Sequence, residues 1–391
     1  MMDKVLGFHR SLFQMMRIGL KSTVARNAAS LYLIQFANYI VPLIQVPYLV
    51  RVLGPAGYGA VAFAQSFISY LSLFVEYGFD WSATRKISVQ RHDVQSVNRI
   101  ALHVWAAKFL LGVVGLVVLI VLALVVPKLR EVLWLLLALY GLVLGNVLFP
   151  TWLFQGMERM VAISVINLGM RVGVLGGVFL LVKKPEHAVM YAGLMGAGAI
   201  AAGATGMIGA VRMFGLRLSR ISWTGIWEVL REGWVLFLSK ASVSLYTAGN
   251  AFILGMLTNH TVVGYYSAAE KVVKSVLGLI GPISQAAYPR FSKLAAESRK
   301  QTLVWGLRLL MIMGLAGSLL MTTVLLCAPF LSALLLGPQF ALSTEVMRIL
   351  APIIFLIALN NTMGVQMLFP LHYDRFVFKT VLMAGCFNVL L

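Results

Sequence analysis

Basic side chains occupy positions in this sequence from which a membrane would normally exclude them. A cation at the centre of a membrane helix costs roughly 2.5–3.5 kcal/mol, so it normally faces a wet cavity or a partner. A cavity with surplus positive charge attracts an anion, and phosphate or pyrophosphate suits it best because their oxygens accept charge-assisted hydrogen bonds. Pairing with acids or with backbone carbonyls on neighbouring helices is the structural alternative. The cations predicted to line such a substrate-binding cavity are Lys108, Arg171, Lys240, Lys271 and Lys274.

Acidic residues in or beside the apolar stretches are few, namely Glu76, Asp80, Glu270 and Glu345. Glu270 alone lies well inside a stretch, and its i,i+4 spacing from Lys274 allows the two to pair on one helix face. A buried acid can change its charge during a transport cycle. Glu270 is therefore predicted to couple transport to protons or sodium ions, with Glu76 and Asp80 as weaker candidates.

Signatures of enzymes and metal sites are missing from the sequence. It contains no Gly-x-x-x-x-Gly-Lys-Ser/Thr phosphate loop, no His-Glu-x-x-His motif and no hydrophilic stretch long enough for a catalytic domain. The 6 histidines are dispersed, and the two cysteines, Cys327 and Cys386, lie in separate apolar runs. We expect no catalytic residue, no metal and no cofactor beyond a coupling ion.

The composition shows which elements must position these residues. The chain has 391 residues, of which 60% are apolar and 12% charged, with a mean hydropathy of +0.89, whereas a soluble domain has roughly 45–50% and 25%. The sequence therefore predicts an all-α polytopic membrane protein. Apolar stretches of spanning length cover 27–50, 58–77, 100–126, 132–154, 160–182, 188–211, 233–257, 262–286, 303–328 and 345–370, and an eleventh begins near Phe376.

Glycine is unusually frequent in the stretch 188–211, which predicts a helix that packs closely against its neighbours.

The net charge of +19 marks orientation in such a protein. Most lysines and arginines fall in the connectors on the side of the N-terminus, which places that side in the cytoplasm. The expected localisation is a bacterial cytoplasmic (inner) membrane, crossed many times, with the N-terminus inside. A basic soluble protein would suggest nucleic acid as partner; here we expect the lipid bilayer and no nucleic acid.

A weak internal repeat divides the chain. Gly59 and Gln65 recur as Gly264 and Glu270, and Arg85 recurs as Arg290, all at one offset. Both copies run in the same direction, which predicts two six-helix lobes related by an axis along the membrane normal; coincidence among glycine-rich helices is the alternative. The expected division is a basic interfacial segment (1–26), an N-terminal lobe (27–220) and a C-terminal lobe (221–391) that looks truncated in its eleventh helix.

Several runs resemble one known family. The specific part is NYIVPLIQVPYLVRVLGP at 38–55, followed by YGFDWSATR at 77–85, PTWLFQG at 150–156, GYYSAAEK at 264–271 and YPR at 288–290. These runs resemble the bacterial polysaccharide flippases, which translocate O-antigen and exopolysaccharide repeat units within the multidrug/oligosaccharidyl-lipid/polysaccharide exporter superfamily.

The resemblance implies two lobes around a central cationic cavity that opens alternately to each side of the membrane. It implies an undecaprenyl-pyrophosphate-linked oligosaccharide as cargo, and the polysaccharide polymerase and chain-length proteins of the same pathway as partners. Arg51, Arg85 and Arg290 are then expected to capture the headgroup on entry.

Other functions stay open on the sequence alone. A lipid II flippase would share the cationic cavity. A multidrug antiporter of the same superfamily should have more buried acids than bases, which is not the pattern here. A membrane glycosyltransferase or polymerase should have a long hydrophilic loop, yet the longest connector runs only from Arg212 to Gly233.

Overall fold

The computed structural model describes residues 23–247, 249–281 and 297–371, together with positions 291, 294, 295, 373, 376, 377, 379, 380, 383 and 384. Its described elements are all helical, which confirms the predicted fold class. Seven helical segments within that part of the chain are long and apolar enough to cross a membrane. Large apolar side chains remain exposed along them, as lipid-facing surfaces require.

The first two predicted spans form one continuous element, α2 (Thr23–Glu76), broken only at Gly54. Gly54 has φ 67° and ψ 175°, a conformation open to glycine because it lacks a Cβ. The chain reverses there, so the two halves of α2 run antiparallel, as the spans 27–50 and 58–77 require. We call this end of the molecule the Gly54 end, and the opposite end, where Gly78 follows α2 with φ 77°, the Gly78 end.

Two local expectations were wrong. The region after Gly78 was treated as a connector but forms a separate helix, α3 (Phe79–Gln90), which buries Phe79, Ala83 and Ile87. The predicted span 233–257 is longer and divided, into α10 (Trp223–Thr247) and α11 (Asn250–Leu257). In both cases charged residues on the exposed face of the helix lower the average hydropathy, so the average does not reveal the apolar residues on the buried face.

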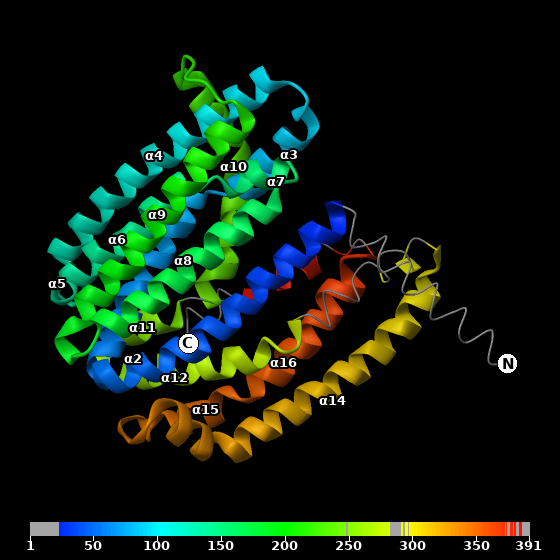
Figure 1. Cartoon of the computed structure of the whole chain (residues 1–391). Helices are drawn as coiled ribbons and strands as arrows, with labels where there is room; N and C mark the ends of the chain where they lie inside the picture. Colours follow the sequence, from blue (N-terminus) through cyan, green and yellow to red (C-terminus); the bar gives the residue numbers. More distant parts are fainter. Residues whose placement is uncertain are drawn as a thin grey trace, which may run out of the picture.

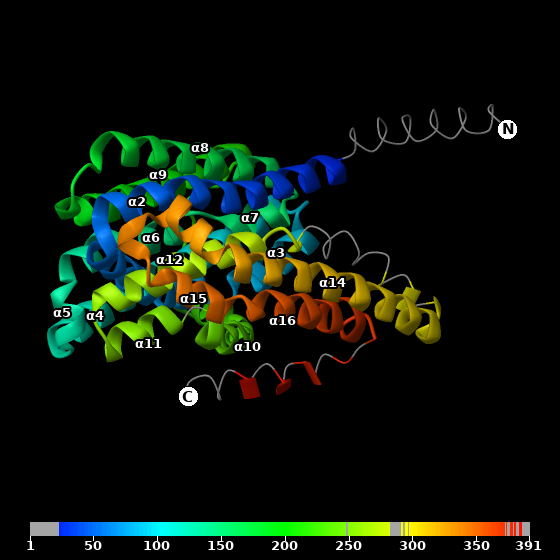
Figure 2. The same ribbon diagram turned by 90° about the horizontal axis from the view of Figure 1, so that it is seen from below.

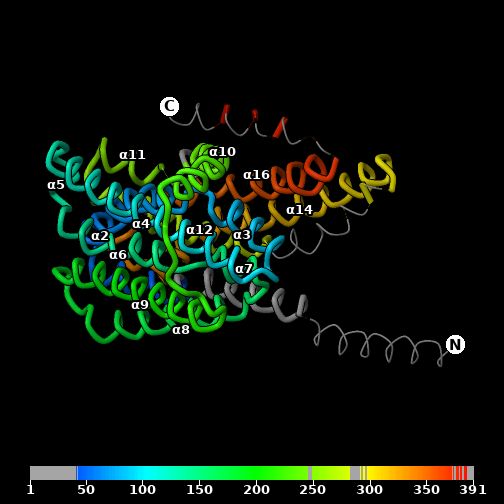
Figure 3. Tube along the Cα trace, turned by 90° about the horizontal axis from the view of Figure 1, so that it is seen from above, coloured from blue at the N-terminus to red at the C-terminus, as the bar shows by residue number. Residues whose placement is uncertain are grey.

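The remaining helices follow the predicted spans and alternate between the two ends. Figure 1 shows them in two groups, with α4, α6, α8 and α9 on one side of α2 and α14, α15 and α16 on the other. Figure 2 shows α8 and α9 on one side of α2 and α14, α15 and α16 on the other, and Figure 3 shows α14 and α16 at the end of the molecule away from α4, α6, α8 and α9. Their bounds are α4 (Val94–Val125), α5 (Pro127–Glu131), α6 (Leu133–Leu148), α7 (Thr151–Gly156), α8 (Met160–Leu181), α9 (Ala188–Phe214), α12 (His260–Leu277), α14 (Arg299–Leu331), α15 (Ser343–Leu350) and α16 (Pro352–Asn361).

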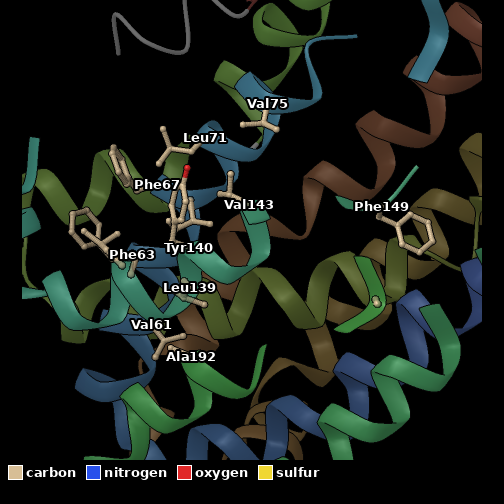
Figure 4. Close-up of a cluster of buried hydrophobic side chains, with 14 of the residues drawn as sticks. Val61, Phe63, Phe67, Leu71, Val75, Leu139, Tyr140, Val143, Phe149 and Ala192 are labelled. Atoms are coloured by element: carbon tan, nitrogen blue, oxygen red, sulfur yellow. The ribbon is translucent and has the colours of Figure 1, made fainter. Parts of the chain in front are cut away.

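Close packing within the first group rests on small residues. A Cβ added to Gly141 on α6 would lie 2.5 Å from the Cα of Gly196 on α9, and one added to Gly203 would lie 2.6 Å from the carbonyl oxygen of Gly145. The two helices are therefore in backbone contact, as the glycines of 188–211 predict. Figure 4 shows the adjacent core, where the second half of α2 meets α6 through side chains that include Phe67, Tyr140 and Val143.

A reciprocal contact joins α2 to α12 near the Gly54 end. A Cβ on Gly59 would collide with the carbonyl oxygen of His260, and a Cβ on Gly264 would collide with the carbonyl oxygen of Pro55. Gly59 corresponds to Gly264, and Pro55 to His260, at the offset of the predicted repeat. The contact thus joins positions that the predicted repeat makes equivalent, and the repeat itself stays a prediction.

Candidate functional site

A cavity of about 570 Å³ lies beside α2, and none of its lining residues belongs to α14, α15 or α16. This volume falls within the roughly 300–1,000 Å³ typical of ligand-binding pockets. Both halves of α2 contribute to its wall, and the rest comes from α6, α8, α9, α11 and α12. The polar and charged side chains on the wall are Gln45, Tyr58, Gln65, Ser66, Ser69, Asn167, Arg171, Tyr191, Ser267, Glu270, Lys271 and Lys274.

Three of the five predicted cavity cations line this cavity. Arg171 reaches it from α8, and Lys271 and Lys274 reach it from α12. Lys274 is paired with Glu270, with 3.0 Å between Nζ and Oε1, as its spacing predicts, and the hydroxyl of Tyr266 donates to the same oxygen over 3.3 Å.

Arg171 and Lys271 have neither an ion pair nor a side-chain hydrogen bond within the described part of the chain. Three cations against one carboxylate leave the lining with two surplus positive charges. Two of the cations also have hydrogen-bonding capacity to spare. An anion that entered could accept charge-assisted hydrogen bonds without first displacing a protein partner.

Neutral polar side chains also line the cavity and were missed by the sequence analysis. Gln45 and Gln65 on the two halves of α2, together with Asn167 on α8, present amides to the cavity. The Gln45 amide donates to the hydroxyl of Tyr191 over 3.4 Å, so part of the wall is already ordered. Uncharged amides inside apolar spans were the signal that could have identified it, since buried polar groups require partners.

Lys108 is not among the residues that line the cavity. Its side chain is only 1% exposed, and Nζ donates to the carbonyl oxygen and to Oδ1 of Asn146, over 2.5 and 3.3 Å. Lys108 is thus held by a backbone carbonyl of a neighbouring helix, which the sequence analysis gave as the alternative to a position in the cavity.

Lys240 also lies elsewhere. Its Nζ is 3.3 Å from Asp80 Oδ2 and 3.6 Å from Glu76 Oε2, and it sits 5.7 Å from the centre of the Trp81 ring. The two weaker coupling candidates are therefore the ion-pair partners of a predicted cavity cation. The sequence could not show this arrangement, because the partners belong to three different helices.

The predicted headgroup-entry residues are spread over the molecule. Arg51 donates through Nη2 to the carbonyl oxygen of Leu334 over 2.5 Å at the Gly54 end. Arg85 is exposed on α3 near the Gly78 end, and Arg290 lies outside the described residues. Their role in entry stays a prediction.

The Gly54 end is held together by contacts between segments far apart in the chain. Lys128 on α5 donates to the carbonyl oxygen of Thr258 over 2.8 Å, and Glu131 lies 3.4 Å from the Nε2 of His260. No group of three histidine, cysteine or acidic side chains suited to a metal ion occurs in the described ranges.

Comparisons with known proteins agree on the class of molecule. Residues 24–295 match the family model described as polysaccharide biosynthesis protein. Two relatives named "Putative O-antigen transporter" are 30% identical, from Escherichia coli (strain K12), and 27% identical, from Shigella dysenteriae. The alignments cover 95% and 93% of this chain and 89% and 91% of those relatives.

Among solved structures, the fold resembles the inward-facing conformation of a multidrug resistance MATE family transporter of the MOP superfamily. The TM-score is 0.61 at 14% identity, over 88% of this chain and 84% of that one. At this identity the likeness concerns the fold alone.

Proposed function

The chain belongs to the family of polysaccharide biosynthesis proteins, and we propose that it translocates a lipid-linked oligosaccharide from one leaflet of a membrane to the other. The observation that carries the proposal is the cavity beside α2, whose lining combines surplus cations with uncharged hydrogen-bonding groups. The O-antigen transporter named among its relatives supports this class of cargo.

The two kinds of polar group on the cavity lining match the two parts of such a cargo. A pyrophosphate would bind Arg171 and Lys271, since the described structure gives neither a partner and each can donate charge-assisted hydrogen bonds. Sugar hydroxyls would exchange hydrogen bonds with Gln45, Gln65 and Asn167, which can both donate and accept. The polyprenyl tail would remain in the lipid, as the apolar outer surface allows.

In its finer form, the proposal is an undecaprenyl-pyrophosphate-linked repeat unit moved by alternating access across the bacterial inner membrane. With the N-terminus inside, the Gly78 end faces the cytoplasm and the Gly54 end faces the periplasm. The contacts of Arg51, Lys128 and Glu131 then close the periplasmic end. This arrangement suits a state that receives cargo from the cytoplasm.

The rival functions make different demands on the same cavity. A multidrug antiporter exporting cationic compounds needs a surplus of carboxylates, whereas Glu270 faces three cations here. A lipid II flippase fits the charge equally well and differs only in the sugars carried. A glycosyltransferase or polymerase needs an acid and a base poised at a reacting bond, and Glu270 is already paired with Lys274.

Complementation tests the proposal. A bacterium lacking its own repeat-unit flippase would express the wild-type chain or the double variant Arg171→Ala/Lys271→Ala, and surface polysaccharide would be measured. Arg308→Ala is the matched control, since Arg308 lies in the predicted span 303–328 and its guanidinium stacks 5.1 Å from the Trp305 ring, away from the cavity lining.

We expect wild type and Arg308→Ala to restore polysaccharide, and the double variant to lose most of it at equal expression. Loss of two charge-assisted hydrogen bonds of about 1.5–3 kcal/mol each corresponds to at least a hundredfold weaker binding. Restoration by the double variant equal to wild type would refute the cavity model. Rescue of a lipid II flippase mutant in place of the repeat-unit mutant would favour that rival.

A further inference from the structure

The polar groups that line the cavity are sorted along its length. Tyr58 lies one turn beyond Gly54 on the second half of α2, and Tyr191 lies in the first turn of α9. α9 begins at the Gly54 end, because a Cβ on Gly57 would lie 3.9 Å from the carbonyl oxygen of Pro185, in the turn that precedes α9. Both phenol side chains therefore belong to the part of the lining nearest the Gly54 end.

The two cations without an ion pair lie farther from that end. α12 begins there at His260, where it contacts α2. α8 finishes there, where the hydroxyl of Tyr48 donates to the carbonyl oxygen of Val182 over 2.7 Å. At about 1.5 Å per residue, Lys271 and Arg171 each lie about 16 Å along their helices from those two ends.

Burial changes in the same direction along the cavity. The side chains of Tyr58, Tyr191 and Ser267 are only 6%, 6% and 5% exposed. Lys271 and Lys274, which lie toward the other end, are exposed. The cavity is therefore closed near the Gly54 end and open toward the Gly78 end. A cargo that enters from the open side places its leading part among buried side chains.

Ser267 presents an unused hydroxyl to the closed part of the cavity. Its Oγ is buried and makes no hydrogen bond within the described part of the chain. Nearby, the amide of Gln45 donates to the hydroxyl of Tyr191 over 3.4 Å, and that hydroxyl can itself donate to a further acceptor. A buried hydroxyl without a partner is costly. A ligand that supplied the missing partner would therefore stabilise this part of the cavity.

The lining thus has an uncharged polar group of side chains near the Gly54 end. We call these residues the sugar subsite, namely Gln45, Tyr58, Tyr191 and Ser267. We propose that the sugar subsite binds the uncharged sugar farthest from the pyrophosphate, so that the cargo enters sugar first. The pyrophosphate follows and stops at Arg171 and Lys271. The inference rests on the proposed function and adds the orientation of the cargo and the class of sugar accepted.

The chemistry of the subsite selects an uncharged sugar. Sugar hydroxyl and acetamido groups donate and accept hydrogen bonds, as do the amide and hydroxyls of the subsite. A carboxylate beside Tyr58 and Tyr191 would be buried about 10 Å closer to the Gly54 end than the two cations, and burial of a poorly paired charge is costly. Glu270, less than one turn from Ser267 on α12, would add repulsion. A carboxylated sugar is therefore accepted only next to the pyrophosphate.

Binding to the purified full chain in lipid nanodiscs tests the subsite. The probes are inorganic pyrophosphate, a neutral trisaccharide joined through a diphosphate to a short prenyl chain, and the same molecule with glucuronic acid as its terminal sugar. The hydroxyl variant is Tyr191→Phe/Ser267→Ala. Tyr48→Phe/Ser275→Ala is the matched control, because it removes the same two groups outside the lining of this cavity.

We expect the hydroxyl variant to bind the neutral trisaccharide probe about tenfold more weakly than the wild type, because two neutral hydrogen bonds are lost. It should bind pyrophosphate as the wild type does, and the control should bind both probes normally. The wild type should bind the glucuronic acid probe at least tenfold more weakly than the neutral one. Equal binding of the neutral probe by the hydroxyl variant and the wild type, or equal binding of the two trisaccharides by the wild type, would overturn the subsite. If the double variant fails to fold, Ser267→Ala against Ser275→Ala decides alone.

A photoreactive diazirine on the terminal sugar of the neutral probe reads the orientation. It should label the wild-type peptides that contain Tyr58 or Tyr191. Labelling of the peptide that contains Asn167, on the far side of Arg171 along α8, would overturn sugar-first entry.

Failure of the proposed function gives a separate result with pyrophosphate alone. We expect the wild type to bind it and Arg171→Ala/Lys271→Ala to lose that binding. No binding by the wild type, or unchanged binding by this double variant, would refute the cationic cavity itself. Pyrophosphate binding that follows the expectation, together with an unaffected trisaccharide, would refute the sugar subsite only.

Discussion

The contact between α2 and α12 predicts a severe effect from a single methyl group. In Gly59→Ala, the new Cβ would collide with the carbonyl oxygen of His260 and lie 2.6 Å from the backbone nitrogen of Gly264. Ordinary contact begins at 3.4 Å, so the helices must separate by at least 3.4 − 2.6 = 0.8 Å. Both obstacles are backbone atoms, which cannot rotate away.

Overpacking of this kind costs typically 1–3 kcal/mol, and a clash with rigid backbone belongs at the upper limit, about 3 kcal/mol. An unfolding entropy of about 2.1 cal/mol/K per residue converts that cost into a melting temperature lower by about 4 °C for a chain of this length. Thermal unfolding of the purified protein in one detergent, followed by intrinsic fluorescence, measures the change.

Gly57→Ala is the matched control on the same helix. Its Cβ would touch the Cβ of Leu53 at 3.4 Å and little else, and alanine favours a helix by up to about 1 kcal/mol over glycine. We expect Gly57→Ala to be neutral or stabilising. Equal melting temperatures for the two variants would refute the close approach of α2 and α12.

Two further changes probe other parts of the fold. Lys108→Met should lower the free energy of unfolding by about 1–3 kcal/mol, because Asn146 loses the hydrogen bonds that the buried Lys108 donates to it. Chemical denaturation checks this against Arg308→Met, which should change little. Asp93 caps α4 by accepting hydrogen bonds from the backbone of Gln95 and Ser96, and its hydrogen bonds to Ser96 hold the pKa of its carboxyl below the usual value. The stabilisation by the Asp93 cap is therefore fully present above the pKa that this carboxyl has in the unfolded chain, and it is lost as the pH falls through the lower pKa of the folded chain. Hydrogen–deuterium exchange of the backbone amides in the first turn of α4 should speed up in that acidic range in the wild type and not in Asp93→Asn.

The spans were predictable because a membrane enforces one simple condition, an apolar run of sufficient length. Averaging the hydropathy over such a run does not detect helices that have one polar and one apolar face. α3 was taken for a connector because its buried residues Phe79 and Ile87 are separated by charged ones, and α10 was predicted ten residues too short, at 233 in place of Trp223.

The candidate site was predictable only in part. Depth within a span identified Lys271 and Arg171 as cavity residues, because an unpaired cation must face water. Depth does not show which way a helix is turned, so Lys108 and Lys240 were grouped with them although they meet other partners. Sequence spacing revealed the pair Glu270 and Lys274 on one helix, but not partnerships between helices.

The glycine contact at Gly59 and Gly264 also has a mechanical consequence. Two backbones that touch without side chains between them can roll on each other, so this point can serve as a pivot. From Gly59 to the end of α2 at Glu76 the helix extends about 25 Å at 1.5 Å per residue. A rotation of about 10° would then move the far end of this lever arm by about 4 Å, while atoms at the pivot barely move. Small angular changes near the Gly54 end would thus be amplified into large displacements at the Gly78 end.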